Sequence, residues 1–331
     1  MIILNLVDES KSDIKYKISK FPDGQQNIII ENRKVLYYPI DTLEFSKVGI
    51  DSVQIKSRLN NWLDLELITC TVASLRELKV KEIHLYVPYI LGARSDRKFE
   101  EGGNNYLKDV ICPAINALGC ETVTCLDPHS DVLEACIKGF RKESNLRLVE
   151  FAIENISGKR FDAPKFVSTE QTLFDIYQPI LVSPDAGASK KIYKLAEQIG
   201  YKGDIVTCSK ERDKDGKLTK TIVPAYDTGP LIMKDYIIID DICDGGATFI
   251  NIAKELKKLY NCNKIYLIVT HGIFSKGFEE LKNYFDGIYC TNSYSNYNPY
   301  PNGFRNKHLM MDPKAKFYDN PDNFVKQLNI F

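Results

Sequence analysis

The segment Tyr236–Thr248, YIIIDDICDGGAT, constrains the fold of this chain more than any other. It begins with an apolar run, Tyr236–Ile239, which is short enough for a buried parallel strand. Two carboxylates, a third acid and a run of small residues follow, and beyond Thr248 the apolar residues have helical spacing. The predicted order is therefore strand, acidic edge, glycine-rich loop and helix N-terminus.

This order of elements predicts a site for a phosphorylated sugar. Free backbone N–H groups at a helix N-terminus, supported by the helix dipole, bind phosphate. The neighbouring carboxylates of Asp240 and Asp241 would accept hydrogen bonds from vicinal hydroxyls. A ligand with a phosphate close to a diol is a ribose 5-phosphate. The alternative is an ordinary turn whose aspartates cap the helix, and for the loop alone that alternative is slightly favoured.

Composition restricts the class of protein. A chain of 331 residues suits two domains or one large α/β unit. Lys plus Arg and Asp plus Glu balance at 44 each, so the net charge gives no indication of nucleic-acid binding. Nine cysteines without zinc-type spacing favour a reduced compartment. Because no signal-like N-terminus or long apolar run occurs, we expect a cytoplasmic protein that does not bind membranes.

Predicted strands and helices alternate along the chain, which indicates doubly wound parallel sheets with ligands at the carboxyl ends of the strands. Before the segment Tyr236–Thr248 the predicted elements are a helix at 63–79, a strand at 83–89, a helix at about 105–118, a strand at 122–126, a strand at 179–185 and a helix at 189–199. The two halves are similar in order, which suggests a duplication. Residues 138–177 have the least readable pattern and contain the expected crossing between the halves, and a short helix is expected to close the chain.

Three predicted strand ends carry acids or histidine on one rim: Asp127 with His129, Asp185, and Asp240 with Asp241. Such groups suit Mg²⁺ that is bound together with nucleotide phosphates. His129 would bind metal or transfer protons, and a purely structural histidine is about as common in this setting.

Two further stretches suit phosphate, although each has an ordinary alternative. In SPDAGASKK, Gly187 and Ala188 lie at a predicted helix N-terminus, and the chain has no Walker A loop. The basic residues from Lys210 to Lys220 are typical of a solvated loop, and the functional alternative is a lid over transferring phosphoryl groups. RSDRK, from Arg94 to Lys98, is by itself more often a solvated charged loop.

Taken together, the motifs resemble the ribose-phosphate diphosphokinase family, also called phosphoribosyl pyrophosphate synthetases. The matches, in family order, are FPDGQ, VPYILGARSDRK, LDPHSD, VSPDAGASKK, SKER, IIDDICDGGAT and VTHGIFS. They extend from Phe21 to about Ser275. The resemblance implies two phosphoribosyltransferase-like α/β domains, each a mainly parallel sheet flanked by helices, at residues 1–145 and 146–305. A tail, 306–331, is expected to pack on the first domain.

The resemblance also implies an activity and its residues: Mg²⁺-dependent transfer of the β,γ-diphosphoryl group of ATP to the anomeric hydroxyl of ribose 5-phosphate. The matching catalytic positions are Lys210, Arg212 and His129. The positions matching the ATP site are Phe21, Asp23, Gln25, Arg94, Ser95, Asp96, Arg97 and His129. The positions matching the acceptor site are Asp185, Asp240, Asp241, Asp244, Gly245, Gly246, Ala247 and Thr248. The metal positions are His129, Asp185, Asp240 and Asp241. Because the family's FPDG loop comes from a neighbouring subunit, a homo-oligomer (dimer or hexamer) that shares the ATP site is implied.

The chain departs from the family pattern in three places. Gln25 stands where the family usually has Glu, and Ser95 stands where it usually has Gln. In the phosphate loop, Gly245 replaces a threonine, which removes a hydroxyl donor worth about 1 kcal/mol and opens space. A more open loop would admit ADP-ribose, which has the same free anomeric hydroxyl, and this loop is similar to that of the family branch associated with nicotinamide and NAD salvage.

Two other functions are possible on the same fold. A phosphoribosyltransferase shares the double-aspartate loop, but the doubled architecture and the predicted lid argue against it. A non-catalytic regulatory subunit would need neither His129, Asp185, Lys210 nor Arg212, and the chain has all four.

Overall fold

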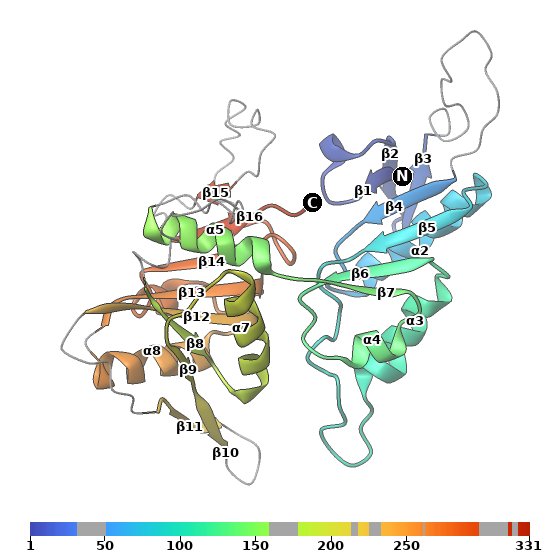
Figure 1. Ribbon diagram of the computed structural model, residues 1–331. Coiled ribbons are helices and arrows are strands. Elements are labelled where there is room, and N and C mark those ends of the chain that lie inside the picture. The colour runs from blue at the N-terminus through green and yellow to red at the C-terminus, as the bar shows by residue number, and fades with distance from the viewer. Residues whose placement is uncertain are drawn as a thin grey trace. The chain divides into compact units, whose positions relative to one another are not determined.

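The computed structural model describes residues 1–31, 51–158, 178–212, 218–224, 233–260, 262–297, 317–319 and 324–331 (Figure 1). Within these residues the chain divides into two compact units. Unit 1 is Met1–Ser144 together with Phe331, and unit 2 is Asn145–Ile330. Each unit contains a mainly parallel sheet with helices packed on it, which confirms the predicted fold class. The assignment of domains to particular functions stays a prediction.

Unit 1 is built on a five-stranded sheet in which every strand is parallel to its neighbours. The strands are ordered β1-β4-β5-β6-β7, which is also their order in the chain. They are β1 (Ile2–Asn5), β4 (Ser52–Lys56), β5 (Glu82–Tyr86), β6 (Thr122–Leu126) and β7 (Phe140–Glu143). The described helical elements are the 3-10 turn η1 (Glu9–Lys11), α2 (Trp62–Glu77), the π turn η2 (Leu107–Ile111), α3 (Cys112–Ala117) and α4 (Val132–Cys136). Because the order of the described strands never reverses, they form no internal switch point.

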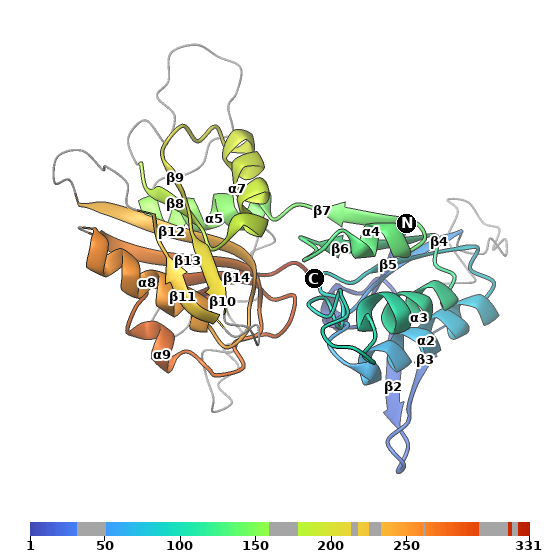
Figure 2. The same cartoon turned by 90° about the horizontal axis from the view of Figure 1, so that it is seen from below.

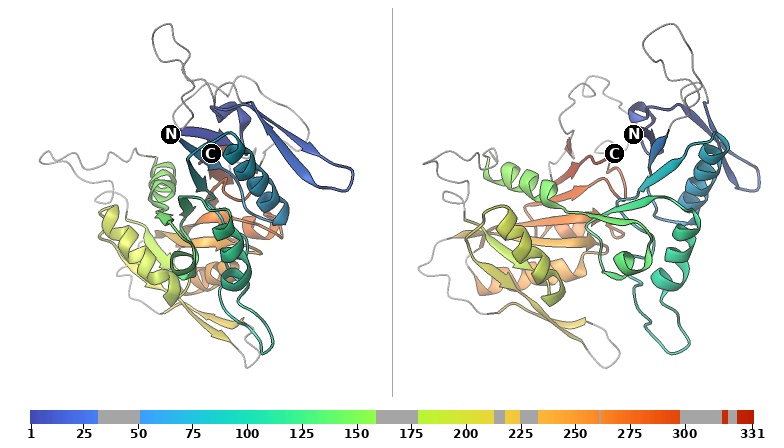
Figure 3. Two further views of the ribbon diagram at one scale, coloured as in Figure 1. Left: turned by 90° about the vertical axis from the view of Figure 1, so that its right-hand side faces the viewer. Right: turned by 45° about the vertical axis from the view of Figure 1, so that its right-hand side comes forward.

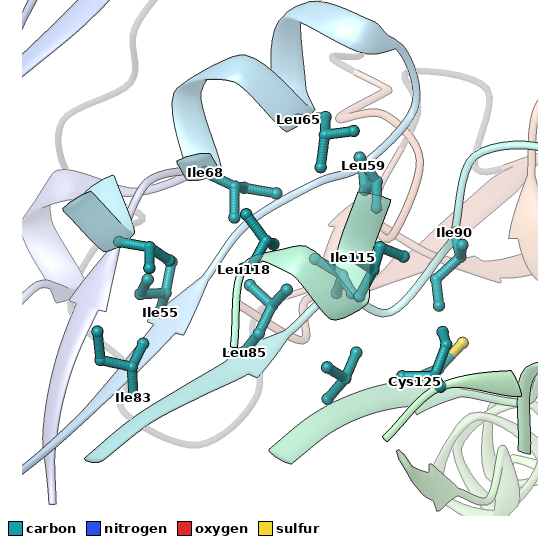
Figure 4. Packing of buried hydrophobic residues seen from close by; sticks show 14 of the residues in the cluster. Ile55, Leu59, Leu65, Ile68, Ile83, Leu85, Ile90, Ile115, Leu118 and Cys125 are labelled. Carbon is teal, nitrogen blue, oxygen red and sulfur yellow. The ribbon is translucent and has the colours of Figure 1, made fainter. Parts of the chain in front are cut away.

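The core of unit 1 lies between one face of this sheet and its helices (Figure 4). Alternate strand residues such as Ile55 and Leu85 point into it, and Ile68 of α2 meets them there. The helix α2 begins at a capping box in which Asn61 and Asp64 satisfy each other's backbone N–H groups. The apolar spacing and this cap together explain why residues 62–77 are helical.

An antiparallel hairpin, β2 (Tyr16–Lys20) and β3 (Gln26–Ile30), belongs to unit 1 and projects beyond its sheet (Figures 2 and 3). Its turn contains Gly24 at φ +96°, a conformation that glycine adopts without strain. The Gln26 side chain donates to the Leu63 carbonyl over 2.8 Å, which ties the base of the hairpin to α2.

Unit 2 contains a seven-stranded sheet ordered β15-β16-β14-β13-β12-β8-β9. Its strands are β8 (Ile180–Ser183), β9 (Ile205–Thr207), β12 (Lys234–Cys243), β13 (Cys262–Gly272), β14 (Gly287–Thr291), β15 (Phe317–Asp319) and β16 (Val325–Leu328). Its helices are α5 (Leu146–Ser157), α7 (Ala186–Gln198), α8 (Ala247–Leu259) and α9 (Glu279–Lys282). A separate hairpin is formed by β10 (Ser209–Arg212) and β11 (Leu218–Ile222). Among the pairs in the seven-stranded sheet, β15 with β16 is antiparallel and the others are parallel.

The chain reverses direction across this second sheet between β8 and β12. From β8 it moves through α7 to the edge strand β9, and from β12 it moves through α8 to β13 on the other side. Helices α5 and α7 cover one face, where Ile237 lies, and α8 covers the other, where Ile238 lies (Figures 1 and 2). In sheets of this kind, ligands bind beside the carboxyl ends of the two strands that flank the reversal.

Several predicted elements differ in the structure. The strand expected at Tyr236–Ile239 continues to Cys243, because its pairing with β13 also continues. Residues 140–143 and 146–157 form β7 and α5, although their sequence pattern was hard to read. The short helix expected near the end is instead β16, which pairs with β14, while Phe331 groups with unit 1. No helix in the described part of the chain is long and apolar enough to cross a lipid bilayer.

Candidate functional site

The loop between β12 and α8 has the geometry expected of a phosphate site. Gly246 is the N-cap of α8, has φ +81°, and makes no side-chain hydrogen bond to the first turn. A Cβ at this position would come within 2.9 Å of Leu281 Cδ2, so a larger residue would disturb the packing. The first N–H groups of α8, a 13-residue helix, thus start from a residue that offers no side-chain acceptor. Such a terminus is suited to an anion.

The paired aspartates lie inside β12 rather than in the turn that follows it. Asp240 accepts a hydrogen bond from the backbone N–H of Asp241 over 2.9 Å. Asp241 is buried, and its Oδ2 lies 2.8 Å from the ammonium of Lys191 on α7. Because Lys191 neutralises a carboxylate that is out of water, the pair holds Asp241 ionised and fixes its direction. Both aspartates lie within the strand, and the N-cap of α8 is Gly246.

Asp185, by contrast, does cap a helix. Its Oδ1 accepts a hydrogen bond from the Ala188 N–H over 3.0 Å at the start of α7. Asp185 comes two residues after the end of β8, so it flanks the strand reversal from one side as Asp240 and Asp241 flank it from the other. The structure thus brings the predicted acceptor residues of unit 2, from Asp185 to Thr248, to one edge of one sheet.

Gly245 leaves a space that another side chain fills. A Cβ built on Gly245 would lie 3.3 Å from Cε and 3.4 Å from Cδ of Lys276. The side chain of Lys276 therefore lies against the loop at the position where Gly245 has no side chain. The extra room expected from the glycine is in this structure covered by a lysine stem.

In unit 1, two predicted groups follow neighbouring strands. His129 is exposed and comes two residues after Asp127, which is buried and has φ +42°. The segment after β5 that leads to Arg94 is joined to the end of β6 by the Leu126 N–H, which donates to the Pro88 carbonyl over 3.1 Å. Since the carboxyl ends of parallel strands meet at one edge, both groups belong to the same edge of the sheet of unit 1.

The remaining predicted ATP residues lie in two loops of unit 1. In the first, Ser95 donates its N–H to Gly92, and the Arg97 guanidinium lies 5.3 Å from the centre of the exposed Phe99 ring. Asp96, in the same loop, accepts at its carbonyl a bond of 2.6 Å from the Asn105 amide. The guanidinium–ring pair is open to solvent and offers a flat cationic surface.

The second loop is the turn of the β2–β3 hairpin. Phe21 is exposed, and its N–H donates to the carbonyl of Gln25 over 2.8 Å. Asp23 accepts from the Gln25 N–H over 3.2 Å. These bonds shape the turn, and the roles of its side chains in binding stay predictions.

The predicted lid corresponds to the β10–β11 hairpin. Lys210 pairs in register with Thr221 and Arg212 with Leu218, with an irregularity between Glu211 and Arg212. Residues 213–217, which include Lys214 and Lys217, lie outside the described residues. A hairpin rather than an unstructured loop supports the two residues that were predicted to act in catalysis.

The described residues contain no group of three or more His, Cys, Asp or Glu side chains placed to hold a metal ion. Burial raises the pKa of the Cys290 thiol to about 12 and that of the Cys262 thiol to about 11. These two cysteines are therefore not reactive thiolates at neutral pH.

Two functional candidates, Lys191 and Lys276, were missed by reasoning from the sequence. Lys191 lies in the SPDAGASKK motif, where a basic residue one turn into the helix was a usable signal. Lys276 follows VTHGIFS, and nothing in its sequence position links it to Gly245, 31 positions earlier (276 − 245).

Comparison with known proteins agrees with this geometry. Residues 162–298 match the family model described as phosphoribosyl transferase domain. A ribose-phosphate pyrophosphokinase of Mycoplasmopsis pulmonis is 28% identical over 294 residues, covering 88% of this chain and 82% of that protein. One from Sulfurisphaera tokodaii is 27% identical over 296 residues, covering 84% and 86%.

The crystal structure of phosphoribosylpyrophosphate synthetase from Mycobacterium smegmatis is similar in fold. It matches with a TM-score of 0.64 at 16% identity and covers 86% of this chain and 82% of its own. This similarity in fold extends over both units and not only over residues 162–298, which match the family model.

Proposed function

We propose that this chain, a homologue of the ribose-phosphate pyrophosphokinases over most of its length, is a diphosphokinase that transfers the β,γ-diphosphoryl group of ATP to the anomeric hydroxyl of ribose 5-phosphate. The products are phosphoribosyl pyrophosphate and AMP. One bond breaks, between the α- and β-phosphoryl groups of ATP, and one forms, between the sugar oxygen and the β-phosphorus.

The observation that carries this proposal is the edge of the second sheet at its reversal. There Asp240 and Asp241 lie near the end of β12, α8 begins a few residues later after the N-cap Gly246, and Asp185 lies on the other side of the reversal. An anion site next to two ionised carboxylates matches a sugar with a phosphate at one end and a diol at the other.

The residues of unit 2 position the acceptor. The N–H groups of α8 bind the 5-phosphate, and the two aspartates accept hydrogen bonds from the ribose hydroxyls. Lys191 holds Asp241 in its ionised form, so its oxygens act as acceptors. Fixing both ends of the sugar orients the anomeric hydroxyl toward the incoming phosphorus.

The donor is MgATP, with Mg²⁺ entering as part of the substrate. Mg²⁺ keeps most of its ligands from phosphates and water and needs one or two protein groups. Asp185 would supply one of those groups, and the ion neutralises charge on the transferring phosphates. Lys210 and Arg212 stabilise the charge that develops during transfer, and Arg94 and Arg97 bind ATP. The turn Phe21–Gln25 is proposed to act in a neighbouring copy of a homo-oligomer.

A second acceptor, ADP-ribose, is favoured by one observation. Gly245 has no side chain beside the 5-phosphate, and the three atoms nearest the position of its Cβ belong to the flexible side chain of Lys276, whose displacement would open room for a larger acceptor. The chemistry at the anomeric carbon would be unchanged, and the product would be the activated form of ADP-ribose.

The test is a paired assay of the purified chain with MgATP. One reaction receives ribose 5-phosphate and the other ADP-ribose, and AMP release and the sugar product are followed by mass spectrometry. Activity with ribose 5-phosphate supports the main proposal, and a preference for ADP-ribose supports the second. Turnover of neither acceptor would contradict both and favour a regulatory subunit.

A further inference from the structure

Lys276 is held beside the acceptor loop by the backbone. It lies between β13 and α9 in a segment whose Ile273 and Phe274 N–H groups both donate to the Cys243 carbonyl, over 2.8 and 3.2 Å. Cys243 is the last residue of β12, directly before Asp244. The segment that carries Lys276 is therefore anchored to the strand that leads into the loop.

Aromatic packing gives this segment a rigid base. The ring of Phe274 lies 4.7 Å from that of Phe278 and 5.4 Å from that of Tyr297. Leu281, in the helix α9 that follows this segment, covers Gly246, as Lys276 covers Gly245. Both glycines of the loop are thus in contact with this segment or the helix that follows it.

The apolar stem of the Lys276 side chain lies on the loop and ends in an ammonium cation. Its Cγ, Cδ and Cε lie 3.3–3.6 Å from the position of a Cβ on Gly245, and the residue is exposed to solvent. Among the described residues its ammonium has no carboxylate within ion-pair distance. A lysine in this state is available to an anion bound by the loop.

We propose that Lys276 binds the phosphate of the acceptor in place of the loop hydroxyl that Gly245 lacks, and that it makes the site selective for a terminal phosphate. This inference rests on the proposed function. A phosphate monoester carries a charge of about −1.5 to −2 near neutral pH, whereas each phosphate inside a diphosphate bridge carries about −1. The cation therefore favours the monoester, and the stem occupies the space through which a larger acceptor would continue.

The test compares Lys276→Met with Lys258→Met, which removes the same charge from the far end of α8. In Lys276→Met the KM for ribose 5-phosphate should rise about tenfold with kcat changed less than about twofold, because the lost contact acts equally in the ground and transition states. The ratio of kcat/KM for ribose 5-phosphate to that for ADP-ribose should fall about tenfold. Lys258→Met should match the wild type, and Lys276→Arg should retain most of the affinity.

Direct binding separates this inference from the proposed function. Calorimetry with ribose 5-phosphate and no ATP should show about tenfold weaker binding to Lys276→Met, with a smaller dependence on salt. Equal binding to both proteins would overturn the role of Lys276 even if the enzyme is active. Absence of turnover in the wild type would overturn the proposed function, and the binding comparison would still decide the role of Lys276. In Gly245→Thr the new Cβ would press on the Lys276 stem, which must shift by a few tenths of an ångström, and the threonine supplies a hydroxyl to the phosphate, so Lys276→Met should then have an effect of less than about threefold.

Discussion

The two sheets of this protein are both mainly parallel, but they are covered differently. In unit 2 the strand β12 is apolar on both faces, with Ile237 against α5 and α7 and Ile238 against α8. In unit 1 the described helices pack on one face, and the other bears a row of polar residues, Gln54, His84 and Thr122, in register on three strands. His84 Nδ1 and Thr122 Oγ1 are 2.8 Å apart in this row.

This difference in helix coverage indicates which unit is expected to contain a site of fixed geometry. Covering both faces of a sheet requires the chain to cross to the other face, and the resulting reversal creates a gap between helices at the strand ends. Unit 2 has such a reversal, and its acids and helix termini meet there. The described strands of unit 1 show no reversal, and the predicted ATP residues of this unit lie in loops and a projecting hairpin. We therefore expect unit 2 to position the reacting groups and unit 1 to contribute affinity for ATP.

The prediction with the largest expected effect tests whether unit 2 acts in catalysis and unit 1 in ATP binding. Lys210→Ala should lower kcat about a thousandfold, or about 4 kcal/mol, because a charge that acts on the transition state is lost. Arg97→Ala in unit 1 should instead raise the KM for ATP about tenfold and leave kcat nearly unchanged. Steady-state kinetics measures both. An unchanged kcat in Lys210→Ala would show that the β10–β11 hairpin is not a catalytic lid.

The next effect tests the coverage of the sheets. Ile237→Ala and Ile238→Ala should each destabilise β12 by about 3 kcal/mol, since both side chains are fully buried on opposite faces. In unit 1, Ile55→Ala should cost a similar amount and its neighbour Gln54→Ala less than about 0.5 kcal/mol. Hydrogen exchange of the β12 and β4 amides follows each unit separately. Equal losses for Ile55 and Gln54 would mean that the sheet of unit 1 is as tightly packed on its second face.

A smaller effect concerns the pair of Lys191 and Asp241. Lys191→Met leaves the buried Asp241 without its cation, so the carboxylate becomes protonated more readily as the pH falls. Acceptor affinity at pH 7 should drop about tenfold, or about 1.4 kcal/mol, and the acidic limb of the kcat/KM profile should move to higher pH. Lys191→Arg keeps the charge and should keep the profile. An unshifted limb in Lys191→Met would contradict a positioning role for this lysine.

The smallest effect is a pH dependence of stability in unit 2. Partial burial and the neighbouring Glu154 raise the pKa of Glu150 on α5. The folded state therefore binds this proton more tightly than the unfolded state, so ionisation of Glu150 costs stability as the pH rises through the raised pKa. Glu150→Gln should stabilise the protein by a few tenths of a kcal/mol at pH 7 and by almost nothing near pH 4. Denaturation midpoints at the two pH values measure this, and a larger gain at pH 4 would contradict the sign.

Much of the site could be predicted from the sequence because its parts are local. A strand, an acidic pair, a glycine loop and a helix lie within Tyr236–Thr248, and their order along the chain sets their order in space. The apolar run predicts that this strand ends at Ile239, before the acids, whereas β12 ends at Cys243. In the structure, pairing with β13 carries the strand to Cys243, and the charge of Asp241 is compensated by Lys191.

The sequence by itself determined the alternation of strands and helices, the phosphate loop and the resemblance to a family, because each depends on residues close together in the chain. The tertiary structure decided which of two aspartate-bearing loops caps its helix, which lysine neutralises Asp241, and what fills the space at Gly245. These facts depend on contacts between α7 and β12 and between the segment after β13 and the loop after β12. Side-chain contacts between distant segments follow from packing geometry, which spacing along the chain does not contain.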